Sequence, residues 1–420
     1  MSSMGFLGGV IVVFFVMAAL ELFAYFLFRF GRYPSGIAHV HEEFSVVSDA
    51  LLEKFATWDR ELGWVPQASQ RKRDNTFGHD SKREPVYFST DHRGGRVSFT
   101  PSKAGISISC YGDSFCFCRE VNDDETWPWY LGERLDKQVY NFGVGNYGLD
   151  QAVLRMERVE AGEPSGIVVM AVTSVTSERV QSVYKHFLDF GNILGVKPRF
   201  KCHSNGGLDF LPSPIESKED LKSLEKWRSH FVLYDDNYPY FLRKQARFPY
   251  LISCFRCGSA LEMLMHVSNK LQKVFLPKKF RRLYDVKARL ERDSVEYASR
   301  CWQSQGELIV RLVERFDSVA RSNGSQPIFL LQHHKRWVKY CRNHNVKPYA
   351  DVLLAAARRC PDMVFLDSMD WLLDYTDDEL DALYSPIGSH HSPAGNNVIA
   401  QGLSLAMAGL RHKDEQNTNS

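Results

Sequence analysis

Residues 166–172 read GIVVMAV, an almost unbroken apolar run with the length of a buried β-strand. Similar runs occur at residues 106–110 (ISISC), 139–142 (VYNF), 327–332 (PIFLLQ) and 363–367 (MVFLD). Helix-like stretches alternate with them, at residues 127–135, 151–160 and 349–359 and from Pro393 onward. Buried strands that alternate with helices are typical of a parallel sheet covered on both faces. The sequence therefore predicts an α/β domain on a five-stranded parallel sheet.

The strand pattern stops between the third and fourth apolar runs. Residues 205–325 form a predicted helical insertion without clear strands, with its best helices at 218–227 and 294–320. We therefore assign residues 101–410 to one α/β domain with this insertion, and residues 33–100 to a polar lead-in. Six aromatic residues of the insertion could stack on sugars, bind a partner, or form a helical core or lid: Trp227, Phe231, Tyr234, Tyr238, Tyr240 and Phe241.

Residues 5–28 (GFLGGVIVVFFVMAALELFAYFLF) are apolar, with Glu21 as their only charge. A helix of this length covers about 36 Å, enough to cross a hydrocarbon core of about 30 Å. A cleaved signal peptide is the alternative, but no Lys or Arg precedes the run and no clear small-x-small site follows it. We expect a single-pass anchor, with Glu21 reaching toward the interface and Arg29 and Arg32 fixing its end.

The composition excludes several classes of protein. Of the 420 residues, 44% are hydrophobic and 24% are charged, which is ordinary globular usage and not that of a disordered or fibrous chain. The 52 basic and 50 acidic residues give a net charge of +2, so no electrostatic footprint for nucleic acid exists. Cys254-Phe-Arg-Cys257 has redox or half-zinc-site spacing, but two thiols on an apolar helix fit it better. We expect no nucleic acid, metal or cofactor.

Ligands of an open parallel sheet bind beyond the carboxyl ends of its strands, so functional residues should follow the strands directly. Ser114 follows the first strand and the turn glycine Gly112, which makes it a candidate nucleophile. The three glycines of residues 143–148 follow the second strand and could bring backbone N–H groups close to an oxyanion. His390 and His391 precede the last helix, where a base could point at the strand ends. In this order the residues form an arrangement for acyl transfer.

Three blocks of sequence resemble SGNH (GDSL-type) hydrolases, and most closely the membrane-anchored bacterial members with a GDSF…V.DDETW signature. The first block is GDSF at 112–115 with VNDDETW at 121–127. The second is NFGVGNYGLDQ at 141–151, and HHSPAGN at 390–396 resembles the fifth block of the family. The resemblance covers roughly residues 85–200 and 325–405 and implies a flavodoxin-like three-layer α/β sandwich.

The resemblance implies a role for each matching residue. Ser114 would be the nucleophile and His390 the base, with His391 as the fallback base. The oxyanion hole would combine the Ser114 N–H with a backbone N–H near Gly145 or Asn146, and Asn146 aligns best with the glycine of the family.

Two features of the family pattern are missing. Its third-block asparagine has no clear match, and Thr176 or Ser174 could replace that donor only in part. The acid expected two or three residues before the histidine is also absent, because Ile387 and Gly388 stand there. A carboxylate from elsewhere, such as Asp367, would have to orient the base.

The expected function is that of a serine esterase or O-acyltransferase, and the resemblance implies O-acyl groups of extracellular polysaccharide as the substrate class. It also implies that the bulk of the chain lies outside the cytoplasmic membrane, although the positive-inside rule applied to Arg29 and Arg32 points the other way. The missing features leave an alternative, a weakened or inactive SGNH-fold protein that acts as a glycan-binding or scaffold component of envelope assembly. A thiol enzyme using Cys116 or Cys118 is a third class.

Overall fold

The structure is a computed structural model that describes residues 3–30, 42–55, 57–74, 85–102, 105–203, 206–257, 260–386 and 389–418. Arg32, Ile387 and Gly388 lie outside the described residues. The chain divides into two compact units. The first unit comprises Met1–Ser48, Tyr184–Gly195 and Leu221–Ser294, and the second comprises Asp49–Val183, Val196–Asp220 and Val295–Ser420.

The second unit contains the predicted five-stranded sheet, and every strand pairs in parallel with its neighbours. The five apolar runs form its strands: β5 (Ile108–Gly112), β6 (Val139–Asn141), β7 (Ile167–Thr173), β10 (Gln326–Gln332) and β11 (Val364–Asp367). Their order across the sheet is β11-β10-β7-β5-β6. Numbered along the chain from β5 to β11, this is the flavodoxin-like order 2-1-3-4-5, and its switch point lies between β5 and β7.

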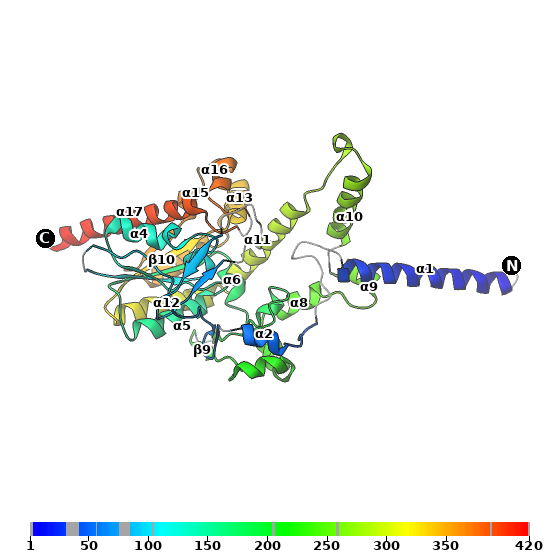
Figure 1. Cartoon of the computed structure of the whole chain (residues 1–420), viewed down its shortest axis with the longest axis horizontal. Helices are drawn as coiled ribbons and strands as arrows, with labels where there is room; N and C mark the ends of the chain where they lie inside the picture. The colour runs from blue at the N-terminus through cyan, green and yellow to red at the C-terminus, as the bar shows by residue number, and fades with distance from the viewer. Residues whose placement is uncertain are drawn as a thin grey trace. The chain divides into compact units, whose positions relative to one another are not determined.

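Helices cover both faces of this sheet (Figure 1). In β7, Val168, Met170 and Val172 point into one apolar core, while Val169 and Ala171 point into the other. The first core is closed by α5 (Leu149–Glu160), α12 (Gly306–Ser322), α13 (Lys335–His344) and α14 (Ala350–Arg359). The second is closed by α4 (Trp127–Leu135) and α17 (Pro393–Thr418). The predicted three-layer α/β sandwich is therefore confirmed.

Several local predictions differ from the structure. Strands β8 (Arg199–Cys202) and β9 (Leu208–Leu211) pair in antiparallel orientation, where no strand was expected. These strands are short and carry Arg, Lys and Asp, so they lack the apolar run that marked the others. The lead-in contains two further antiparallel pairs, β1 (Trp58–Asp59) with β2 (Gly63–Trp64) and β3 (Arg71–Arg73) with β4 (Tyr87–Ser89).

The two clearest helices predicted for the insertion also differ in form. Residues 294–320 belong to two helices, α11 (Val286–Ser304) and α12, which are interrupted at Gln305. Residues 218–227 form the 3-10 element η4 (Lys218–Trp227), in which Ser223 departs from helical geometry. The break lies at Gln305, which has a non-helical φ of −107° and ψ of 10°, directly before Gly306, the first residue of α12.

The first unit contains the apolar N-terminal helix, α1 (Ser3–Phe30). Within it, the 23-residue span Leu7–Arg29 contains an 18-residue window with a mean hydropathy of 2.6, so the helix is long and apolar enough to cross a membrane by length and composition. None of the six aromatic residues of the insertion is exposed. Phe231 and Phe241 are fully buried, where they pack in one aromatic cluster with Phe44, Tyr184 and Phe187. Phe231 and Phe241 therefore belong to the core of this unit.

Candidate active site

Ser114 stands at the switch point of the sheet, as the first residue of the short helix α3 (Ser114–Phe117) directly after β5. The turn before it requires glycine, because a Cβ on Gly112 would lie 1.7 Å from the Ala171 carbonyl oxygen of β7. Asp113 caps α3, its Oδ1 accepting a hydrogen bond of 2.9 Å from Phe115 N–H. Its other oxygen accepts from Thr173 N–H at 3.1 Å, which ties the turn to the end of β7.

His390 lies beside Ser114, as the sequence order predicted. Its Nε2 is 2.8 Å from Ser114 Oγ, which is hydrogen-bond distance. The segment that carries it is fixed at both ends. Before it, Ser385 N–H donates to the His390 carbonyl at 2.7 Å, and after it Ser392 Oγ accepts from Gly395 N–H at 3.2 Å at the start of α17. The ring is thereby held where it can share the hydroxyl proton of Ser114.

Glu120 supplies the carboxylate behind the histidine. Its Oε1 is 2.6 Å from His390 Nδ1, so Ser114, His390 and Glu120 form a continuous hydrogen-bonded chain. The Glu120 side chain is completely buried. Burial alone acts to raise the pKa of Glu120, but the hydrogen bond and the charge of His390 outweigh it, and the pKa is lowered. Glu120 is therefore a carboxylate at neutral pH, and its Oε1 can accept a hydrogen bond from a protonated His390 Nδ1.

The prediction that Asp367 orients the base was wrong. Asp367 Oδ1 is bonded to His333 Nε2 at 2.7 Å, and its Oδ2 accepts from Lys347 Nζ at 3.0 Å and from Tyr349 OH at 2.9 Å. The physical reason is the strand order. Asp367 ends the edge strand β11, which β10 and β7 separate from β5 and Ser114.

The backbone of residues 117–123 bends in an unusual way to place Glu120 under the histidine. Cys118 and Glu120 both adopt left-handed φ angles, 59° and 74°, which side-chain-bearing residues rarely do. Such backbone strain needs surrounding support, and it clusters at functional sites. Glu120 N–H contributes to this support by donating to Asp74 Oδ2 at 3.0 Å.

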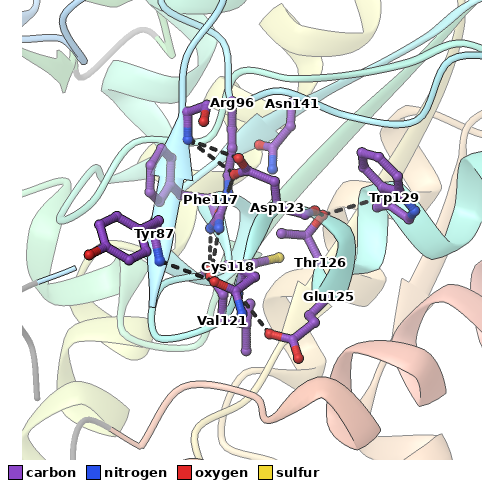
Figure 2. Close-up of polar contacts among 12 residues, drawn as sticks. Tyr87, Arg96, Phe117, Cys118, Val121, Asp123, Glu125, Thr126, Trp129 and Asn141 are labelled. Atoms are coloured by element: carbon purple, nitrogen blue, oxygen red, sulfur yellow. Dashed lines mark hydrogen bonds and ion pairs between the residues drawn. The ribbon is translucent and has the colours of Figure 1, made fainter. Parts of the chain in front are cut away.

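Arg96 provides most of that support (Figure 2). Its guanidinium is buried and donates to the Phe117 carbonyl at 2.8 Å, to the Val121 carbonyl at 2.6 Å and to Asp123 Oδ1 at 2.9 Å. Arg96 N–H also donates to the Asn141 carbonyl of β6 at 2.7 Å. A residue of the lead-in therefore fastens the Glu120 loop to the edge of the sheet.

The glycine-rich loop after β6 runs along the Ser114 turn. Val144 N–H donates to the Gly112 carbonyl at 3.0 Å, and a Cβ on Gly143 would lie 2.3 Å from Phe117 N. Gly145 and Asn146 come next in the chain. The Gly145 carbonyl accepts from Trp64 Nε1 at 3.0 Å, and Asn146 has a left-handed φ of 70°. This places the loop beside the nucleophile turn, and the role of Gly145 or Asn146 as oxyanion donor stays a prediction.

Thr176 and Arg179, which follow strand β7, are also close to this loop. Thr176 Oγ1 accepts from Leu149 N–H at 2.8 Å, so its hydroxyl holds the start of α5. Arg179 Nη1 bridges the nucleophile turn and the loop, donating to Asp113 Oδ2 and to the Tyr147 carbonyl, both at 3.0 Å. The Thr176 hydroxyl still has a proton to donate, and its part in an oxyanion hole is likewise a prediction.

His391, the fallback base, is placed differently from its neighbour. Its ring contacts Phe115 and Tyr384, with centroid distances of 4.9 and 5.0 Å, and neither ring nitrogen has a hydrogen-bond partner among the described residues. Burial, reinforced by His390 and His333, lowers the pKa of His391 to about 3. His391 is therefore a neutral packing residue, and the structure brings only His390 to Ser114.

This buried histidine predicts a pH dependence of stability. Between about pH 6.5 and 3 the unfolded chain protonates this histidine and the native state does not, so the free energy of unfolding falls as the pH falls. We expect the loss to approach roughly 4–5 kcal/mol at the acid end of this window. His391→Phe should flatten the fall when denaturant unfolding is measured from pH 7 to 4.5. The exposed His344→Phe serves as the control. Equal slopes for wild type and His391→Phe would contradict the assignment.

The cysteine hypotheses find no support. Cys116 and Cys118 are buried beside Ser114, and burial raises the pKa of Cys118 to about 12 and that of Cys116 well above its usual value. Such thiols stay protonated, whereas a nucleophile must be a thiolate. Burial also raises the pKa of the Cys254 and Cys257 thiols. Across the described ranges, no group of three His, Cys, Asp or Glu residues could hold a metal.

No family model matches the chain, and no curated protein matches it. Among solved structures it is similar to a protein described as lipolytic, of the G-D-S-L family, from Desulfitobacterium hafniense DCB-2, with 14% identity and a TM-score of 0.33 over 71% of this chain and 98% of that one. It is also similar to a protein described as an SGNH hydrolase from Slackia heliotrinireducens, with 12% identity and a TM-score of 0.31 over 72% and 100%.

A third similar structure is that of an α/β hydrolase from the metagenome of Lake Arreo, Spain, with 11% identity and a TM-score of 0.34 over 74% of this chain and 97% of that one. With similarity this distant, function has to be argued from the site itself.

Proposed function

We propose that the protein is a membrane-anchored serine esterase or O-acyltransferase of SGNH type. The observation that carries the proposal is the hydrogen-bonded chain from Ser114 through His390 to Glu120. A hydroxyl nucleophile, a base within hydrogen-bond reach and a carboxylate behind that base are the three parts of an activated serine. Ser114 lies in the first of the sequence blocks that resemble SGNH hydrolases and His390 in the last, while Glu120 lies between the two motifs of the first block.

In the first half of the reaction, Ser114 Oγ attacks the carbonyl carbon of an ester while His390 Nε2 takes the hydroxyl proton. Glu120 holds the Nδ1 proton, which keeps Nε2 free as the acceptor and stabilises the imidazolium that forms. The tetrahedral intermediate collapses, the C–O bond to the alcohol breaks, and His390 returns the proton to the leaving oxygen. An acyl-Ser114 ester remains.

In the second half, His390 takes a proton from the acceptor, whose oxygen attacks the acyl carbon. The bond to Ser114 Oγ breaks, and the serine recovers its proton from His390. Water as the acceptor gives hydrolysis, and a sugar hydroxyl gives transfer. The negative oxygen of both intermediates needs backbone donors, for which we propose the Ser114 N–H and one from Gly145 or Asn146, with Thr176 as an additional hydroxyl donor.

The proposed substrate class is an O-acyl ester of cell-surface polysaccharide. This part of the proposal rests on the resemblance of the sequence blocks to the membrane-anchored members of the family. The α1 helix supplies an anchor of sufficient length, and we propose that it is retained, with the catalytic unit on the outer side of the membrane.

A fluorophosphonate probe tests the proposal directly, since it bonds covalently only to an activated serine. We expect the purified full chain, in detergent, to take up one label, and peptide mass spectrometry to locate it on Ser114. Acetylated polysaccharide and a small aryl acetate, supplied separately, should then show whether the acyl group moves to water or to a sugar. A folded chain that takes no label and turns over neither ester would instead support the binding or scaffold alternative.

A further inference from the structure

The last turns of α1 are packed against another helix of the same unit, α9 (Tyr250–Arg256), as Figure 1 shows. Glu21 accepts hydrogen bonds from Tyr250 N–H and, at 3.0 Å, from Leu251 N–H. The rings of Tyr25 and Tyr250 lie 5.1 Å apart. The single charge of the apolar span therefore accepts hydrogen bonds from the backbone N–H groups at the start of α9.

This contact fixes the depth of α9 relative to the span. Glu21 stands eight residues before Arg29, the end of the apolar stretch, which is about 12 Å along a helix axis. A helix that contacts Glu21 and Tyr25 thus overlaps the last two turns of the span. With α1 across a bilayer, α9 lies at the boundary between headgroups and acyl chains, where amphipathic helices bind.

The outer surfaces of α9 and the next helix, α10 (Ala260–Phe275), are apolar. On α9, Ile252 and Phe255 are 60% and 80% exposed, although Tyr250 and Cys254 on the same helix pack inward with Phe28 of α1. On α10, at least half of each side chain is exposed at four positions that share one helical face: Leu264, Leu271, Val274 and Phe275. Exposed apolar stripes of this kind mark an interaction surface.

Basic residues predominate in the part of the chain that carries most of this surface. Residues 264–284 contain six basic residues and no acidic one, in a chain whose total charge is only +2. The basic residues are Lys270, Lys273, Lys278, Lys279, Arg281 and Arg282. Apolar residues that alternate with Lys and Arg favour an anionic lipid surface. A second copy of the same chain fits less well, because it would bring two basic segments together.

We propose that the outer faces of α9 and α10, with residues 276–284, form a second membrane-binding surface that lies in the headgroup region of an anionic bilayer around the point where α1 leaves it. The proposal rests on α1 spanning the membrane and is independent of the catalytic chemistry. Its consequence is that the first unit lies against the bilayer and is held there by more than a single helix.

Tryptophan quenching by brominated lipids tests the proposal in the full chain, reconstituted in vesicles of phosphatidylcholine and phosphatidylglycerol. Phe275→Trp reports on α10, Phe14→Trp on the middle of α1, and Leu354→Trp on α14 of the other unit as the solvent control; all three positions are exposed. The emission of the wild type is subtracted. We expect the Trp emission at position 275 to be quenched most strongly by bromines near the headgroups, and the emission at position 14 most strongly by bromines deep in the acyl chains. The emission at position 354 should not be quenched.

The outcomes separate the surface from the span. Quenching at position 14 without quenching at position 275 overturns the second surface and leaves the span intact. If Trp emission is quenched at neither position, both the span and the second surface are overturned. If the Phe275→Trp variant were an unquenched dimer, and Phe275→Asp converted the dimer to monomers, the face would be assigned to a second copy. Changing Lys270, Lys273, Lys278 and Lys279 to Gln should reduce the quenching at position 275, as should omitting phosphatidylglycerol. Quenching unchanged by both would overturn the anionic-lipid preference.

Discussion

Ser114→Ala is expected to reduce turnover of a p-nitrophenyl ester on the order of 10,000-fold or more, because removing the nucleophile of a serine triad leaves only the residual catalysis of the binding site. The initial rate of nitrophenol release by the full chain in detergent measures the effect. The fold should survive, since Ser114 loses a single hydrogen bond, to His390, worth about 1 kcal/mol. Unchanged circular dichroism and a similar unfolding midpoint check this.

Ser404→Ala is the matched control for this variant. Ser404 lies on α17, and its hydroxyl donates only to the Gln401 carbonyl of the same helix, at 2.9 Å. We expect its turnover to stay at the wild-type level. If Ser114→Ala hydrolysed the ester as fast as Ser404→Ala, the nucleophile would be another residue or the hydrolysis would not take place at this site.

Glu120→Gln is the second change with a large expected effect, up to about 10,000-fold in kcat. A glutamine can donate its amide to His390 Nδ1, which leaves the ring proton on Nε2, the atom that must accept the proton of Ser114. The volume of the side chain hardly changes, so packing is preserved. The kcat for ester hydrolysis and the rate of fluorophosphonate labelling should fall together, because both depend on the same activated oxygen.

Asp367→Asn is the control that separates the two candidate acids. Asp367 bonds His333, Lys347 and Tyr349, and among the described residues none of these three is hydrogen-bonded to Ser114, so its replacement should leave kcat within a few-fold of wild type in protein that remains folded. The reverse pattern, a near-normal Glu120→Gln and an inactive Asp367→Asn, would restore the original prediction and refute the present assignment.

The sheet and the serine–histidine pair could be predicted from the sequence because both leave local signals. A strand buried on both faces must be a nearly continuous apolar run, as residues 166–172 are. Residues that follow such strands meet at one edge of the sheet, which is why Ser114 and the histidine before α17 could be paired although 276 positions separate them. The choice of His390 over His391 came from the resemblance, and the contact geometry agrees.

The acid could not be predicted because its position depends on backbone geometry and backbone hydrogen bonds, which the residue types in the sequence do not indicate. In a sequence, a glycine usually indicates a left-handed backbone position, but here Cys118 and Glu120 adopt this conformation. The support comes from Arg96, in a stretch that reads as irregular lead-in, through bonds to backbone carbonyls that any sequence would offer. The family pattern predicts an acid just before the histidine, whereas the carboxylate is supplied by the loop that follows the nucleophile.

The loop that Arg96 supports also determines when the proposed site is completed during synthesis. Ser114 and Glu120 are only six positions apart, so nucleophile and acid emerge from the ribosome together and can take their places as β5, β6 and β7 pair. The base is 270 positions beyond the acid. A nascent chain already inserted through α1 therefore holds a hydroxyl with no base to activate it. In the proposed mechanism, hydrolytic activity begins only after the segment with His390 has been synthesised and α17 has closed the last layer.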